Sequence, residues 1–259
     1  MFYGVLFWKV PHLLLFGDKM YFLLDSNVTA GYYLPRSLGS KKACKRIEMI
    51  FDSVRSRGSN HFFYIPNFCI AEVFGVFAKY CFGDWNPHVR SKGTIDPRLY
   101  VKLIKQFEKD IHNGKFLYHY ELSRYHILAV DLVAPVDHYF RISRSIKKQA
   151  KPMGTFDHLI IAMGIHLAHI HTPEKICILS ADDRLTAILR KCKSYIPRNT
   201  LKKLKLDIAA EITGKPFGPN IFPRVLNLKS AKDQELVDIF GGWPLEIRTH
   251  KKVYRYLKV

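Results

Sequence analysis

Two short apolar segments far apart in this chain end in acidic residues, and this pattern limits the folds that the chain can adopt. The run MYFLL stops at Asp25, and the run ICILS is followed by Asp182. Apolar runs of this length bounded by polar turn residues are typical of buried strands. Because helical patterns follow both runs, the sequence predicts a parallel sheet whose strands deliver carboxylates at their carboxyl ends. We expect Ser26 or Asn27 to cap the helix after the first strand.

The rest of the chain also alternates between predicted strands and predicted helices. Predicted helices cover 41–57, 184–192, 196–214 and 232–243, and further ones begin at Asn67, at Pro97 and at Gly154 or Thr155. Further predicted strands cover 61–66 and 222–229. The segment 115–131 alternates aromatic and polar residues, so it is predicted as one or two strands, with a basic amphipathic stretch from about Pro135. This order predicts a three-layer α/β/α fold around a mostly parallel sheet, with helical insertions and a C-terminal extension.

Three regions are expected along the 259 residues. Residues 1–19 are predicted as an N-terminal extension upstream of a natural start at Met20, with an extra strand or docking arm as the alternative. Residues 20–230 are predicted to form the main domain, and residues 231–259 a C-terminal extension packed on it. No run of about 18 apolar residues is present, so a membrane span is not expected.

The charge of the chain points to a polyanionic partner. Lysine and arginine number 41 against 22 acids, a formal charge of +19. Nucleic acid is the first expectation, an anionic membrane surface the second, and a generally basic surface the alternative. The candidate phosphate contacts are basic residues clustered on predicted helices: Lys41, Lys42, Lys45, Arg46, Arg55, Arg57, Lys147, Lys148, Lys202, Lys203 and Lys205.

Five cysteines without a CxxC pair predict buried thiols in a reducing compartment, and hence a cytoplasmic protein. His166, His169 and His171 form an HxxHxH pattern that could bind zinc. Their place at a helix C-terminus favours an interaction with the helix dipole instead.

Two more acids stand in apolar surroundings. Glu72 is the only acid of the helix NFCIAEVFGVFAKYCF, and Asp157 lies in the first turn of the helix TFDHLIIAMGIHLAHIH. An ion pair would explain the first, and the helix dipole the second. If both meet Asp25 and Asp182 at one sheet edge, however, a hard divalent cation is needed to neutralise them. Oxygen ligands of this kind suit Mg²⁺ or Mn²⁺, which can activate water for attack on a phosphodiester.

The ordered set LLDSN, IAEVF, FDHLIIAMGIHLA and ILSADDRL resembles the PIN domain family over about residues 20–230. The resemblance implies a metal-dependent endoribonuclease with Asp25, Glu72, Asp157 and Asp182 as catalytic metal ligands. Asp183 is the alternative fourth ligand, and Ser26, Asn27 and Ser180 are supporting residues. It also implies RNA as the substrate, and often a toxin with a protein antitoxin.

Several alternatives remain open at this point. The segments 83–115 and 195–223 and the C-terminal tail lengthen the chain beyond the usual toxin. A larger RNA-processing protein, or an RNA-binding scaffold with little or no catalysis, is equally compatible, and a homodimer is possible. A phosphatase of the haloacid-dehalogenase kind needs a second acid two residues after its first aspartate, where this chain has Asn27.

Overall fold

Five parallel strands form the centre of the molecule. The computed structural model describes residues 19–56, 59–83, 93–114, 116–143, 152–196 and 221–245. The strands are β1 (Tyr21–Leu24), β2 (Phe62–Pro66), β3 (Leu117–Tyr120), β4 (Ile176–Ser180) and β5 (Arg224–Asn227). They lie in the order β3-β2-β1-β4-β5, and every neighbouring pair is parallel. The predicted parallel α/β sheet is therefore confirmed.

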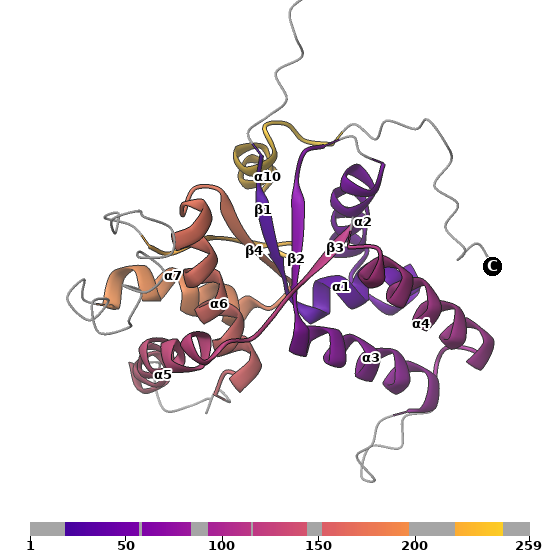
Figure 1. Ribbon diagram of the computed structural model, residues 1–259, viewed down its shortest axis with the longest axis horizontal. Coiled ribbons are helices and arrows are strands. Elements are labelled where there is room, and N and C mark those ends of the chain that lie inside the picture. Colours follow the sequence, from indigo (N-terminus) through magenta and orange to yellow (C-terminus); the bar gives the residue numbers. More distant parts are fainter. Residues whose placement is uncertain are drawn as a thin grey trace, which may run out of the picture.

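Helices cover both faces of this sheet, as Figure 1 shows. One layer contains α1 (Ser26–Tyr33), the short 3-10 helix η1 (Arg36–Leu38), α2 (Lys41–Arg55), α3 (Asn67–Phe82) and α4 (Pro97–His112). The other contains α5 (Arg124–Ser143), α6 (Thr155–His171) and α7 (Asp183–Tyr195). A final helix, α10 (Asp233–Phe240), follows β5. The fold is therefore a three-layer α/β/α sandwich.

The strand order fixes where a ligand site belongs. The chain moves outward from β1 to β2 and β3, then returns to the other side of β1 to form β4 and β5. This reversal lies between β1 and β4, which pair from Tyr21 opposite Ile176 to Leu24 opposite Leu179. In open α/β sheets, ligands bind outside the carboxyl ends of the strands at such a switch point. Asp25 and Ser180 lie at that point.

Apolar side chains pack around the strands that lead to Asp25 and Asp182. Phe22, Leu24, Phe63 and Ile65 alternate along β1 and β2 and are fully buried, and the ring of Phe51 on α2 lies 4.6 Å from that of Phe63. On the other layer, α6 packs closely on β4. A Cβ atom on Gly164 would lie 2.6 Å from Cδ1 of Ile178, so only glycine permits this approach without rearrangement.

One prediction of secondary structure was wrong. The segment predicted as one or two strands contains only β3, and α5 begins at Arg124 and continues through Pro135 to Ser143. Residues 126, 129, 133 and 136 are buried, which is helical spacing. Pro135 is exposed, so the carbonyl group that loses its helical partner faces water instead of the core.

Several expectations concern residues outside the described ranges. These are the N-terminal extension up to residue 18, Arg57, the basic residues Lys147 and Lys148, all but the first residue of the helix expected over 196–214, with Lys202, Lys203 and Lys205, and the tail from 246. Within the described ranges, no helix is both long and apolar enough to cross a bilayer.

Candidate carboxylate site at the carboxyl edge of the sheet

Asp25 is the most buried of the four predicted acids. It follows β1 directly, is 3% exposed, and its backbone N–H donates to the carbonyl oxygen of Leu179 on β4 at 3.0 Å. Burial raises the pKa of Asp25 to about 6, and the charges of Glu72 and Asp182 raise it further. Hydrogen bonds from the Ser180 hydroxyl and from Asn27 oppose this rise in pKa. Burial and the neighbouring charges therefore disfavour the ionised form of Asp25 at this edge of the sheet.

Polar neighbours fix the orientation of this carboxylate. The hydroxyl of Ser180 and the side-chain amide of Asn27 each donate to Oδ2 of Asp25 at 2.6 Å, and the Ser26 hydroxyl donates to Oδ1 at 3.3 Å. The predicted capping role of Ser26 or Asn27 was wrong: Asp25 occupies the N-cap position of α1, and neither side chain bonds the helix N-terminus. The two side chains bind the acid instead, as supporting residues would.

Asp157 reaches the same edge from the opposite helical layer. It is half-buried in the first turn of α6, where its Oδ2 accepts a hydrogen bond of 3.2 Å from the N–H of Gly154. Burial raises the pKa of Asp157 to about 7, and the charges of Asp25, Asp182 and Glu72 add to the rise. The helix-capping contact lowers the pKa but does not offset these effects. Asp157 therefore lies within electrostatic range of all three other acids.

Glu72 lies in the second turn of α3, near the buried thiol of Cys69. Burial raises the pKa of that thiol, and the charges of Asp25 and Glu72 raise it as well. The thiol therefore lies within electrostatic range of both carboxylates. Cys69 was predicted only as a buried thiol, and its spacing of three residues before Glu72 on a helix was the available signal that the two side chains share a face.

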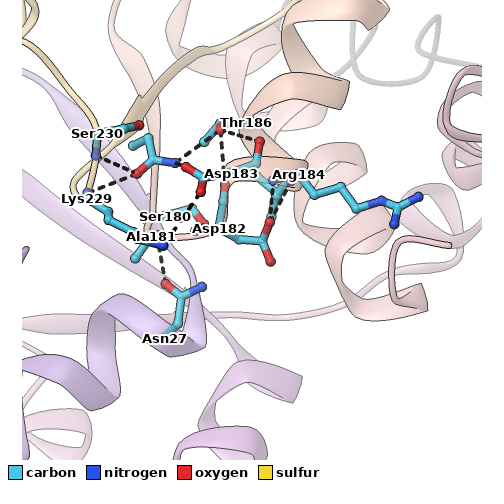
Figure 2. A network of polar contacts seen from close by, with 11 residues as sticks. Asn27, Ser180, Ala181, Asp182, Asp183, Arg184, Thr186, Lys229 and Ser230 are labelled. Atoms are coloured by element: carbon cyan, nitrogen blue, oxygen red, sulfur yellow. Dashed lines mark hydrogen bonds and ion pairs between the residues drawn. The ribbon is translucent and has the colours of Figure 1, made fainter. Parts of the chain in front are cut away.

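Asp182 and Asp183 have different surroundings, as Figure 2 shows. Asp182 caps α7: its Oδ1 accepts from the N–H groups of Arg184 and Leu185 at 2.6 and 3.1 Å, and its own N–H donates to Oγ of Ser180 at 2.9 Å. Its charge affects both Asp25 and Asp157.

Asp183 faces β5 instead. Its Oδ1 accepts from the amide of Asn227 at 2.8 Å, and its Oδ2 lies 3.7 Å from Nζ of Lys229. Asn27 joins the two sides of the switch point, since its Oδ1 accepts from the N–H of Ala181 at 3.0 Å (Figure 2). The contacts of Asp183 support a structural role at the α7–β5 junction, and those of Asp182 a place beside Asp25.

The four site acids differ in their partners from many other acids of the described residues. Among the described residues, none of Asp25, Glu72, Asp157 and Asp182 forms an ion pair with lysine or arginine. By contrast, other acids have arginine partners in the pairs Arg36–Glu48, Arg46–Asp233, Arg55–Asp110, Arg184–Asp137 and Arg190–Glu235. The chain has many cations, yet the charges of these acids act on one another. A cluster of this kind is unfavourable without a counter-charge.

The donor set suits a divalent cation by its chemistry. Four carboxylates from four separate elements offer only hard oxygen ligands, and their mutual repulsion would be relieved by Mg²⁺ or Mn²⁺. As they stand, however, no three His, Cys, Asp or Glu side chains in the described part of the chain form a group that could hold a metal ion. Binding would therefore draw these side chains closer together.

The basic residues predicted to contact phosphate divide into two kinds. Arg46 is 4% exposed and donates to Leu228 O and to Asp233, and Arg55 pairs with Asp110, so both stabilise the fold. This burial contradicts the expectation that Arg46 contacts phosphate. Lys41, Lys42 and Lys45 are exposed on the first turns of α2. Lys41 and Lys45 line a pocket of about 480 Å³ that also includes Arg36, Ser37, Glu48, Met49 and Asp52.

Two histidines of α6, His166 and His171, have hydrogen-bond partners on the sheet. Nδ1 of His166 lies 2.6 Å from the hydroxyl of Tyr120, and Nε2 of His171 lies 3.0 Å from that of Tyr64. The ring of His171 also stacks on that of Tyr21 at 3.8 Å. Burial lowers the pKa of His166. These contacts give the HxxHxH pattern a packing role between α6 and the strands.

Sequence reasoning did not identify a buried aspartate that ties the site helices together. Asp137 on α5 is 3% exposed; its Oδ1 accepts from Arg184 at 2.9 Å and its Oδ2 from the N–H of Met153 at 3.0 Å. These contacts join the turn before α6 to the start of α7, and hence the backbone next to Asp157 and Asp182.

Comparison of the chain with protein-family models, with curated proteins and with solved structures finds no match.

Proposed function

We propose that this chain is a PIN-like nuclease that hydrolyses RNA phosphodiester bonds with Mg²⁺ or Mn²⁺ held by Asp25, Glu72, Asp157 and Asp182. The observation that carries the proposal is the electrostatic effect of these acids on one another. The charges of Glu72 and Asp182 add to the burial that raises the pKa of Asp25 to about 6, and the charges of Asp25, Asp182 and Glu72 add to the burial that raises the pKa of Asp157 to about 7. Asp25 and Asp182 follow β1 and β4 at the switch point of the sheet, and Glu72 and Asp157 lie on α3 and α6 within electrostatic range of them.

The side chains around the acids support this role. Ser180 and Asn27 hold Asp25 in one orientation through its Oδ2, so its position does not depend on a ligand. Asp182 uses Oδ1 to cap α7, and its Oδ2 has no hydrogen bond among the described residues. A bound divalent cation would supply activation of water and neutralisation of the charge that develops on the phosphodiester.

The positive charge of the whole chain supports RNA as the partner. Four carboxylates alone would repel a polyanion, whereas a net charge of +19 attracts it. The exposed lysines Lys41, Lys42 and Lys45 can contribute phosphate contacts without loss of internal ion pairs. Binding should therefore weaken steeply as salt increases. An antitoxin partner, a toxin role and a homodimer are not part of this proposal.

Cleavage of a labelled single-stranded RNA in Mn²⁺ tests the proposal. We expect the wild type to cleave, and Asp25→Asn and Asp157→Asn to lose at least ~100-fold in rate, because each removes a negative ligand from the cation. Glu108→Gln changes an exposed acid on α4 and is the matched control. Circular dichroism must show that all variants are folded.

The competing function is an RNA-binding scaffold. Salt-sensitive binding of RNA by the wild type without cleavage in Mg²⁺ or Mn²⁺ would support the scaffold and overturn the nuclease. Cleavage that survives unchanged in both Asp→Asn variants would also overturn it, because the activity would then come from another site or from a contaminant.

A further inference from the structure

Two phenylalanines from opposite helical layers stack on each other at the edge of the sheet. The ring centroids of Phe68 on α3 and Phe156 on α6 are 5.2 Å apart, and the rings are inclined by only 14°. Phe156 is 47% exposed, while Phe68 is half-buried. The stack therefore presents an aromatic surface to solvent at a place where α3 and α6 both begin.

The stacked rings lie close to the carboxylates because the two phenylalanines are sequence neighbours of site residues. Phe156 directly precedes Asp157 in the first turn of α6. Phe68 directly precedes Cys69, whose buried thiol lies within electrostatic range of the carboxylates of Asp25 and Glu72. The same helical turns therefore carry the aromatic rings and the acids, and any nucleic acid whose phosphate reaches Asp157 must pass close to Phe156.

Core packing does not account for Phe156. Large buried rings such as Phe22 and Phe63 are fully enclosed, whereas Phe156 leaves nearly half of its surface in water. Single exposed apolar residues are common on proteins. Exposed aromatic rings are the side chains on which proteins stack unpaired nucleobases, and here one such ring lies one residue from a site acid.

We propose that Phe156, supported by Phe68, stacks on a base next to the phosphate that is cut, and so restricts the substrate to single-stranded RNA. This inference rests on the proposed function. A base within a duplex has both faces covered by its neighbours, so it cannot stack on a protein ring unless it leaves the helix. An unpaired base is available at no such cost. Phe156 is thus a specificity-determining residue.

Binding of a fluorescent single-stranded RNA, measured by anisotropy without divalent cations, tests the stack separately from catalysis. Phe156→Ala should weaken binding by about tenfold, a stacking contribution of the usual size, and Phe156→Tyr should retain wild-type affinity. Phe82→Ala is the matched control. Phe82 is 70% exposed at the other end of α3, roughly 21 Å from Phe68 along the helix axis.

A series of RNAs, each with one abasic position, shows whether a single base is held. The wild type should lose about tenfold in affinity at one position, and Phe156→Ala should be insensitive at that same position. Equal affinity of wild type and Phe156→Ala, an equal loss in Phe82→Ala, or duplex binding as tight as single-strand binding would overturn the stacking proposal.

The outcomes separate this inference from the nuclease proposal. If the wild type cleaves RNA while Phe156→Ala binds and cleaves as well as the wild type, the stacking proposal fails and the nuclease stands. If Phe156→Ala weakens binding at one base while no divalent cation supports cleavage, the stacking contact is confirmed and the nuclease fails.

Discussion

The hydroxyl of Ser180 donates a 2.6 Å hydrogen bond to Oδ2 of Asp25, 155 residues away in the chain. The same oxygen of Ser180 accepts from the N–H of Asp182 at 2.9 Å. One fully buried hydroxyl thus connects the ends of β1 and β4 and two of the four site acids. The switch point is held together by this serine before any ligand is bound.

Ser180→Ala should destabilise the protein by about 1–3 kcal/mol, because it leaves buried polar groups of Asp25 and Asp182 without their partner. The serine lowers the pKa of Asp25, so it favours the charged carboxylate. The loss of stability should therefore be larger at pH 8 than at pH 5. Urea unfolding at both values measures this, and an equal loss at both would show that the hydroxyl does not act on the charge.

Metal-free wild-type protein should lose stability relative to Asp157→Asn as the pH rises from about 4 to 8. With pKa values of about 6 for Asp25 and about 7 for Asp157, against 3.8 for an ordinary aspartate, the folded state binds more protons than the unfolded chain in this range. The free energy of unfolding falls with pH wherever this is so. Urea midpoints in a chelating buffer give the difference between the two proteins.

The wild type is compared with Asp157→Asn because buried histidines also change the stability with pH. Burial lowers the pKa of His61 and His126 to about 4, and such groups change stability with pH in the opposite direction. Both proteins contain them, so their contribution cancels. Parallel curves for wild type and Asp157→Asn would contradict the raised pKa of Asp157.

Asp137→Ala should cost about 3 kcal/mol, because it leaves Arg184 without its buried partner and the Met153 N–H without an acceptor. Arg190→Ala is the control, since the pair of Arg190 and Glu235 is solvent-exposed and should contribute less than about 1 kcal/mol, and this change keeps the hydrogen bond from the N–H of Lys232 to Glu235. Chemical unfolding of the two variants provides the comparison. Similar losses in both would mean that Asp137 does not brace the helices of the site.

Gly164→Ala and Gly75→Ala should change stability in opposite directions. A methyl group at 164 would collide with Ile178 and Pro223 between α6 and β4, and overpacking of this kind costs about 1–3 kcal/mol. Gly75 lies within α3, and no neighbouring atom is within 4 Å of the added methyl, so alanine should stabilise the helix by about 0.5–1 kcal/mol. Thermal unfolding measures both, and a destabilised Gly75→Ala would refute the second expectation.

Much of the fold follows from local sequence signals. The strands before Asp25 and Ser180 were predictable because each is a short apolar run ended by polar residues, and α4 because Asp96 caps it and Pro97 opens it. α5 was missed for a physical reason. The aromatic alternation of β3 continues to Tyr120, and the helix that starts four residues later contains Pro135, which usually marks a boundary.

The candidate site was predictable in its members but not in its contacts. The acids stood out as carboxylates in apolar surroundings, and strand order then places their elements at one edge. The sequence cannot show that Ser26 and Asn27 bind Asp25 rather than cap α1, since both roles use the same residue types at the same place. Asp137 and Phe156 act through contacts between distant helices, which no local pattern reveals.

Calorimetric titration of the metal-free protein with Mn²⁺ at pH 6.5 tests the central claim most directly, namely that Asp25, Glu72, Asp157 and Asp182 together hold a divalent cation. The account predicts saturable binding by the wild type with release of protons, because Asp25 and Asp157 titrate near this pH. It predicts at least ~10-fold weaker binding by Asp157→Asn and unchanged binding by Glu108→Gln. Absence of saturable binding, or equal affinity in wild type and Asp157→Asn, would contradict it.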